Sequence, residues 1–138
     1  MSVPSSKRSV AENFATGFAA NDLNDYTHNV VKNPNYFPKT ERYLLARDIR
    51  EIANKIEDDI WFANSLNMED ESEAQYRMKL QRLSMLNISK LIRMIGRAHR
   101  WNYIGFHTYE VWTRKCDSLY KLLYSWNRKD KRKLEGNA

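Results

Sequence analysis

Apolar side chains recur at spacings of three and four residues along most of the chain, and this periodicity constrains the fold more than any other feature. The cleanest stripe is Tyr109, Trp112, Cys116, Leu119, Leu123 and Trp126. A second unbroken stripe is Leu45, Ile49, Ile52, Ile56, Ile60 and Ala63. Such repeats are typical of helices that pack one face against neighbouring helices.

Two further segments show the same helical period with local irregularities. Between residues 10 and 32, the pair Phe14 and Phe18 is out of step with the apolar residues that follow, so we expect a fresh helix start at Asn21-Asp22. The segment ends before two prolines, which disfavour helix in the residues preceding them. The remaining segment has the inner stripe Leu80, Ser84, Ile88, Leu91, Ile95 and Ala98.

The four segments predict an all-α protein with an up-down-up-down antiparallel four-helix bundle. The second helix is expected from about Thr40 to Leu66 and the fourth over 105–129. The third helix is expected to begin at Ser72, because Ser72 and Gln75 fit a capping box. Only 4 Gly and 3 Pro occur in 138 residues, which fits long helices joined by short turns.

This length predicts one domain, with a bundle over residues 10–129, a flexible N-terminus over 1–9 and a flexible basic tail over 130–138. The single cysteine, Cys116, excludes an intramolecular disulfide and a Cys-based zinc site. Apolar runs are short and the N-terminus lacks a signal-peptide core, so we expect a cytoplasmic protein with no membrane partner.

Charge is distributed unevenly along the chain. Residues 1–73 hold 8 Lys/Arg against 13 Asp/Glu, whereas residues 74–109 hold 7 basic residues and no acid. Residues 110–138 hold 8 basic and 4 acidic residues. This asymmetry predicts either a polyanionic partner or acidic and basic surfaces that meet between subunits.

At about 100° per residue, the basic residues of the third helix form a ridge that is separate from its apolar stripe and about 30 Å long. Only Leu86 on that line is not basic. The predicted nucleic-acid-binding residues are Arg77, Lys79, Arg82, Lys90, Arg93, Arg97 and Arg100, with Arg128, Lys129, Lys131, Arg132 and Lys133 from the tail.

A ridge of this length matches the phosphate spacing of a nucleic-acid backbone, and Trp101 and Tyr103 could stack on unpaired bases. Two other readings stay open. The ridge could be a solvated face, or it could pair with an acidic surface, for which Glu57, Asp58 and Asp59 of the same chain are candidates.

No constellation for catalysis, a metal or a cofactor is recognisable, so we expect a protein that is not an enzyme. The histidines His28, His99 and His107 lack ligand-spaced partners, and the last two are expected at the surface. Cys116 lies on an apolar stripe and is expected to be a buried filler. Trp61 lies beside a stripe, where it could pack between subunits.

The stretch "FPKTERYLLARDIR", Phe37 to Arg50, resembles the helix 1–2 junction of accessory variability determinant (Avd) proteins of diversity-generating retroelements and their S23-like relatives. Phe37-Pro38, Lys39 and Arg42-Tyr43 match this pattern, as does Ala63 further along the chain. Trp126, followed by basic residues, matches the end of the last helix. Ala46 departs from the family, which commonly has Gly there, and the segment "EIANKIEDDIWFAN" favours the retroelement branch over the S23-like one.

The resemblance covers about residues 12–130 and implies a bacterial or phage-encoded, nonenzymatic subunit. It implies a barrel-like homopentamer that binds the retroelement's reverse transcriptase and nucleic acid, RNA or DNA, and supports mutagenic copying of a template RNA. The alternative is a protein–protein assembly module whose basic face meets an acidic protein surface.

Overall fold

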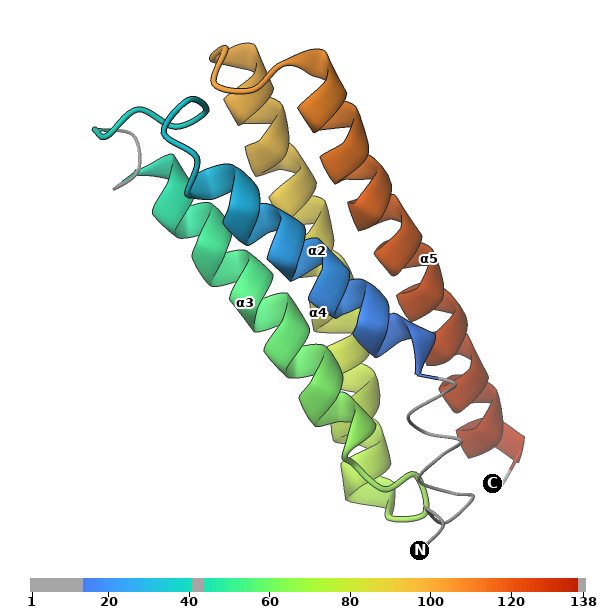
Figure 1. Cartoon of the computed structure of the whole chain (residues 1–138). Coiled ribbons are helices and arrows are strands. Elements are labelled where there is room, and N and C mark those ends of the chain that lie inside the picture. The colour runs from blue at the N-terminus through green and yellow to red at the C-terminus, as the bar shows by residue number, and fades with distance from the viewer. Residues whose placement is uncertain (1–13, 41–43, 137–138) are drawn as a thin grey trace, which may run out of the picture.

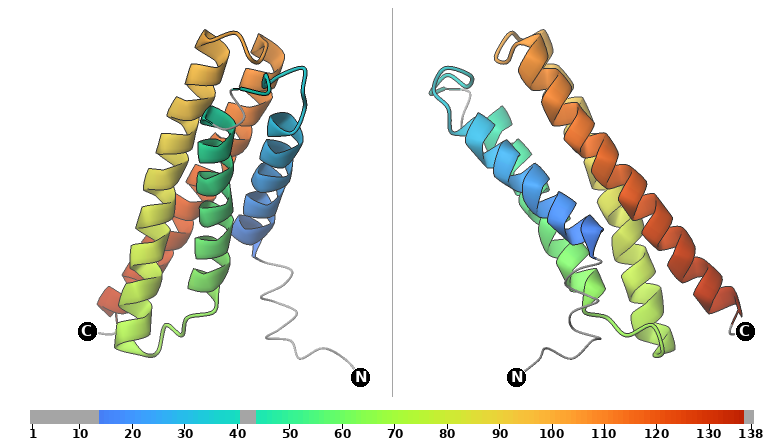
Figure 2. Two further views of the ribbon diagram at one scale, coloured as in Figure 1. Left: turned by 90° about the vertical axis from the view of Figure 1, so that its left-hand side faces the viewer. Right: turned by 45° about the vertical axis from the view of Figure 1, so that its right-hand side comes forward.

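The computed structural model describes residues 14–40 and 44–136. Within them the chain forms four α-helices and no β-strand: α2 (Ala15–Val31), α3 (Leu45–Asn64), α4 (Glu71–Arg100) and α5 (Phe106–Gly136). Consecutive helices run antiparallel, and the pairs α2–α3, α3–α4, α4–α5 and α2–α5 pack side by side (Figures 1 and 2). The predicted four-helix bundle is therefore confirmed for the described residues.

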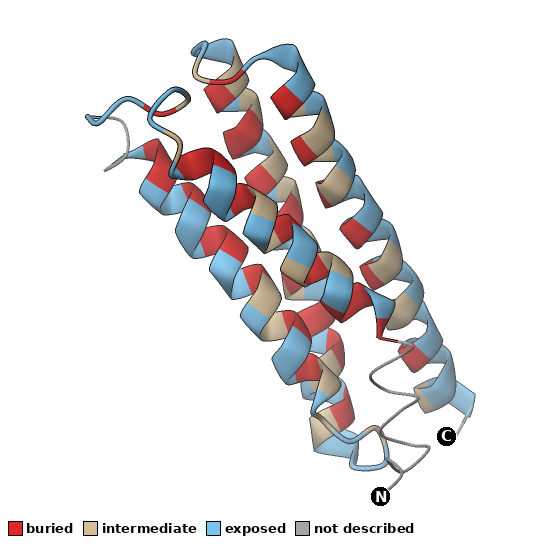
Figure 3. Cartoon of the chain, in the orientation of Figure 1, coloured by how far each residue is buried: buried red, intermediate tan, exposed pale blue. Residues whose placement is uncertain are grey.

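The core lies along the bundle axis and is built from the predicted stripes. All six stripe residues of α3 and all six of α4 are buried. In α5, Trp112, Cys116, Leu119 and Leu123 are fully buried, whereas Tyr109 and Trp126 pack at the margin of the core. Figure 3 shows the buried positions recurring along the inward side of each helix.

Helix α2 is continuous, so the predicted restart at Asn21-Asp22 is wrong. Its buried face includes Thr16, Gly17 and Thr27, which apolar periodicity does not count, and Phe18 is half-exposed rather than in the core. Thr27 links α2 to α5, because its hydroxyl accepts from the Trp112 indole N–H at 2.9 Å and donates to the Leu23 carbonyl at 2.7 Å.

The N-cap of α4 lies two residues before the predicted position. Asp70, not Ser72, is the N-cap, and its carboxylate accepts from the backbone N–H of Glu73 at 3.1 Å. The sequence Asp70-x-x-Glu73 thus supplies the cap, and the acidic first turn complements the positive end of the helix dipole.

The boundaries at both ends of the predicted bundle shift as well. Helix α5 continues to Gly136, so the prediction of a flexible tail is wrong for residues 130–136. Helix α3 begins at Leu45 rather than at Thr40. The predicted N-terminal segment, the Arg42-Tyr43 match and residues 137–138 lie outside the described residues.

Candidate nucleic-acid interface

A line of six basic side chains runs along the outward face of α4, and we call it the α4 ridge. At about 100° per residue, it lies opposite the buried stripe of the same helix. All six are exposed, and Leu86, the apolar residue on the same line, is 67% exposed. The α4 ridge consists of Lys79, Arg82, Lys90, Arg93, Arg97 and Arg100.

No acidic side chain of the described residues neutralises the α4 ridge, since the ion pairs found there all involve other cations. The acidic cluster of α3 is engaged locally: Asp59 pairs with Lys55 at 3.0 Å, and Glu57 accepts from the Asn24 amide at 3.2 Å. The alternative in which this cluster pairs with the ridge of its own subunit is therefore not realised among the described residues.

Arg77 is not part of the exposed surface, which corrects its assignment to the interface. Its Nε lies 2.7 Å from Oδ2 of Asp130, and its Nη2 lies 3.3 Å from Oδ1. The guanidinium also donates to the Leu66 carbonyl and lies 5.0 Å from the Trp126 ring centre. Both charged side chains are largely buried, at 14% and 4% exposure, so Arg77 is a structural cation that joins α4 to α5.

The basic residues near the C-terminus are held on α5 and divide between two sides of that helix. Arg128, Lys131 and Arg132 line a shallow groove of about 420 Å³, whose lining also includes Tyr124, Asn127 and the acidic Glu135. Lys129 and Lys133 are exposed, but they point about 100° or more away from Arg128. The groove side is therefore the part of this cluster that can act with the α4 ridge.

The groove of α5 lies at the same level as one end of the α4 ridge. The Asn127 amide, which also lines the groove, donates to the Gln81 side-chain oxygen at 2.8 Å, and Gln81 lies between Lys79 and Arg82 in the chain. Helices α4 and α5 pack side by side, about 8–10 Å apart, so this end of the α4 ridge and the α5 groove lie on neighbouring helices at the same height along the bundle.

One basic residue of this surface was missed by the sequence analysis. Lys121 is exposed and lies seven residues before Arg128, which places both on the outward line of α5. The seven-residue spacing from Arg128 was a usable signal for Lys121, although Lys121 lies before the basic tail. Arg114 is also exposed there, although it pairs with Glu110 at 2.6 Å.

The aromatic residues at the α4–α5 turn have different environments. Trp101 is 50% exposed and can stack on a base, whereas Tyr103 is partly buried against Phe37, with ring centres 5.6 Å apart. His99 is also partly buried, stacked on Tyr109 at 4.7 Å, so its expected surface position is corrected. His107 is exposed as expected.

The described residues offer little for other kinds of site. Cys116 is fully buried, as predicted, and burial raises the pKa of its thiol to about 12. Among these residues, no group of three or more His, Cys, Asp or Glu side chains is arranged to hold a metal ion. None of the four helices has a stretch that is both long and apolar enough to cross a membrane.

No protein-family model matches the chain, and no curated protein is significantly similar to it. The fold and the surface alone therefore define the class of protein: a four-helix bundle with an unneutralised basic ridge on α4 and a basic but mixed surface on α5.

Proposed function

We propose that the chain is a nonenzymatic nucleic-acid-binding subunit. The observation that carries this proposal is the α4 ridge, in which six exposed cations on one line have no acidic partner among the described residues. Like charges held in a row on one helix repel each other, so a solvated structural face gains nothing from this arrangement. A polyanion gains entropy when these side chains displace its condensed counterions.

The particular role follows from the resemblance of Phe37–Arg50 and the bundle's last helix to Avd proteins. On that basis we propose an accessory subunit of a diversity-generating retroelement. It would assemble as a homopentameric ring and bind the reverse transcriptase together with the template RNA or its cDNA. The basic surface of α4 and α5 is the proposed nucleic-acid contact.

The ridge is tested by reversing two of its charges. The double variant Arg82→Glu/Arg93→Glu alters exposed side chains that lean toward α5 and have no partner in the described chain. We expect duplex or single-stranded nucleic acid to bind the wild-type chain with a steep salt dependence and the variant at least about a hundredfold more weakly. Fluorescence anisotropy over a salt series measures both quantities.

The matched control is Lys39→Glu/Arg50→Glu, which makes the same net charge change at exposed positions that belong to neither α4 nor α5. The control should retain most of the affinity, and circular dichroism should show that both variants stay helical. Equal losses in the two variants would show that net charge, rather than the ridge, governs binding.

The retroelement assignment has a separate test. The tagged chain should co-purify with a diversity-generating reverse transcriptase encoded next to its gene. A neighbourhood without such a polymerase would refute the assignment and leave the nucleic-acid-binding proposal standing.

An assembly module is the second candidate, because an aromatic patch lies exposed on another side of the bundle. It consists of Phe18, Trp61, Phe62 and Tyr76, which are 37–52% exposed. The rings of Phe18 and Trp61 lie 6.2 Å apart, and those of Phe62 and Tyr76 lie 5.9 Å apart. Clustered exposed aromatics are typical of protein interfaces.

A further inference from the structure

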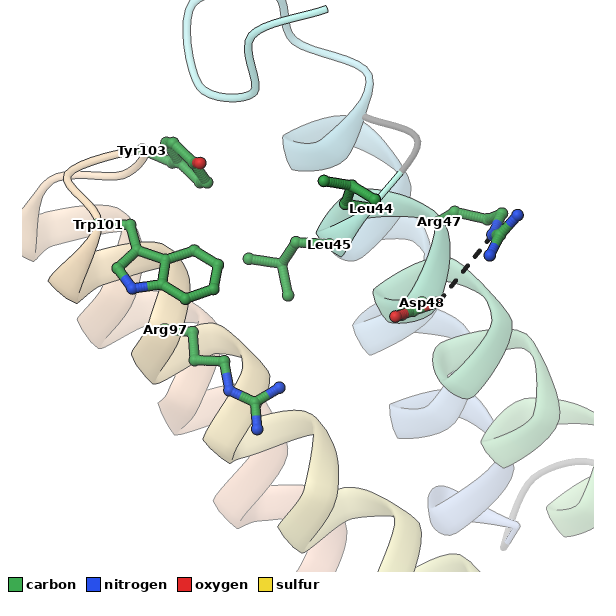
Figure 4. Close-up of a pocket in the computed structure, with 7 residues that line it drawn as sticks. All are labelled: Leu44, Leu45, Arg47, Asp48, Arg97, Trp101 and Tyr103. Atoms are coloured by element: carbon green, nitrogen blue, oxygen red, sulfur yellow. Dashed lines mark ion pairs between the residues drawn. The ribbon is translucent and has the colours of Figure 1, made fainter. Parts of the chain in front are cut away.

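A cleft of about 490 Å³ opens between the first turn of α3 and the last turn of α4, at one end of the α4 ridge (Figure 4). Its apolar wall comes from Leu44 and Leu45 on one side, and Trp101 and Tyr103 face them from the other. Leu44 is 63% and Trp101 50% exposed, although both are large apolar side chains. The volume of this open cleft falls within the range of small-ligand sites, about 300–1,000 Å³.

The aromatic wall is held in place by the backbone at the end of α4. The N–H of Tyr103 donates to the Ala98 carbonyl at 2.9 Å, and the N–H of Asn102 donates to the His99 carbonyl at 3.0 Å. This pair of bonds is a Schellman cap, with Asn102 in the left-handed conformation at φ 63°. Trp101 is therefore presented at the cleft by a defined turn.

The cleft is lined by two cations and one anion: Arg97 lies on one wall, and Arg47 and Asp48 lie on the opposite wall. Arg97 comes from α4, while Asp48 comes from α3 (Figure 4). They do not pair with each other in the described structure, since the nearest cation to Asp48 is Arg47, at 4.0 Å. The Asp48 carboxylate is about half-exposed, so it retains acceptor capacity.

We propose that this cleft binds an unpaired guanine base of a bound nucleic acid. Guanine carries acceptors at O6 and N7, which suit an arginine, and donors at N1 and the 2-amino group, which suit a carboxylate. Its flat face can stack on Trp101. Adenine lacks the O6 acceptor that Arg97 would contact, and it lacks the N1 and 2-amino donors that Asp48 would contact. The two side chains would therefore favour guanine over adenine by contacting two different edges of the base. This inference rests on the proposed nucleic-acid binding, because the ridge delivers the strand to the cleft.

The first test uses mononucleotides and so does not depend on the ridge. In two-dimensional NMR, the indole N–H resonance of Trp101, assigned with Trp101→Phe, should shift on titration with GMP. We expect an affinity about tenfold higher for GMP than for AMP. Asp48→Asn should remove this preference, because an amide nitrogen would then face the 2-amino donor of guanine.

Asp58→Asn is the matched control, since it removes the same charge from an exposed position of α3 that does not line the cleft. It should leave the preference for GMP unchanged. Equal shifts with GMP and AMP in the wild-type chain, or a preference that survives in Asp48→Asn, would overturn the inference.

A second test separates the cleft from the ridge. Wild-type chain should bind a ten-thymidine strand with one central guanine more tightly than the same strand with adenine. Arg82→Glu/Arg93→Glu should weaken both while preserving their ratio. Equal binding of the two strands would refute the inference that the cleft binds guanine, and it would leave the proposed function intact. A preference for GMP without binding to either strand would refute the proposed function, and with it the role of the cleft in a bound nucleic acid.

Discussion

Cys116 lies between Trp112 and Leu119 on the inner stripe of α5 and is fully buried. Desolvation raises the pKa of its thiol to about 12, and the neighbouring negative charge of Asp117 adds to this effect. The thiolate is the reactive form of cysteine, so at pH 8 only about one molecule in ten thousand carries it. The side chain acts as a small apolar filler.

The stability of the fold should consequently depend on alkaline pH through this thiol. In the unfolded chain the thiol ionises near pH 9, whereas in the folded chain it stays neutral until about pH 12. Its contribution to the free energy of unfolding is complete below pH 9 and is lost as the pH rises toward 12, by up to about 1.4 kcal/mol per pH unit. Other groups also titrate above pH 9 and change the stability there. The contribution of the thiol is therefore isolated by comparing the wild type with a variant that lacks it.

We expect the stability difference between wild type and Cys116→Ala to shrink by about 1 kcal/mol between pH 8 and pH 10. Urea unfolding of both proteins at the two pH values measures this change. A difference that stays constant would show that the thiol does not titrate differently in the folded state.

At the level of single elements, the last turns of α5 depend on one buried carboxylate. Asp130 accepts from Arg77 at 2.7 and 3.3 Å and from the Gln81 amide at 2.7 Å. These bonds anchor residues 128–133 of α5 to α4, and with them the α5 part of the basic surface. Removing the carboxylate would leave a largely buried guanidinium without its counter-charge.

Asp130→Ala should therefore destabilise the bundle by about 3 kcal/mol. It should also increase amide hydrogen exchange selectively over residues 126–136. Glu135→Ala, at an exposed position of the same helix, is the control and should change little. Loss of stability without faster exchange in this segment would mean that Asp130 supports the core but not the end of α5.

The sequence contained a signal for the Arg77–Asp130 ion pair, although a search for apolar residues alone does not detect it. The seven-residue repeat of the last helix, extended by four residues beyond Trp126, reaches Asp130, and the inner stripe of α4, extended back seven from Ser84, reaches Arg77. Two opposite charges at stripe positions of neighbouring helices predict a buried ion pair. Since no Pro or Gly occurs between residues 106 and 135, nothing in the sequence stopped the helix at 129.

Stripes of large apolar residues predicted α3, α4 and α5 well, because burial in a bundle follows the helical period directly. Helix α2 was less predictable, since its buried face includes Thr16 and Thr27, and packing against α3 and α5 leaves Phe18 outside. The α4 ridge follows from the same geometry and was predictable. The cleft was not, because it forms only when residues 44–48 and 97–103 meet in the folded bundle.

Across the whole molecule, charge is separated between two pairs of adjacent helices. Helices α2 and α3 carry Asp22, Asp25 and the acidic cluster of α3, while α4 and α5 carry the basic surface. This separation gives the subunit a polarity that would orient a polyanion toward α4 and α5 during encounter. The aromatic patch extends across α2, α3 and the N-terminal half of α4, so it leaves most of the basic surface free.

If the aromatic patch joins subunits, then assembly and nucleic-acid contact are separable properties. Phe62→Ser/Tyr76→Ser removes two exposed rings whose centres lie 5.9 Å apart, and we expect at least about tenfold weaker self-association in sedimentation equilibrium. Leu86→Ser removes an exposed apolar side chain from the ridge line instead and should leave assembly unchanged. A duplex of about ten base pairs, short enough for one ridge, should bind the double variant as tightly as wild type. Dissociation by Leu86→Ser alone would place the subunit contact on α4 and argue that the basic face meets protein.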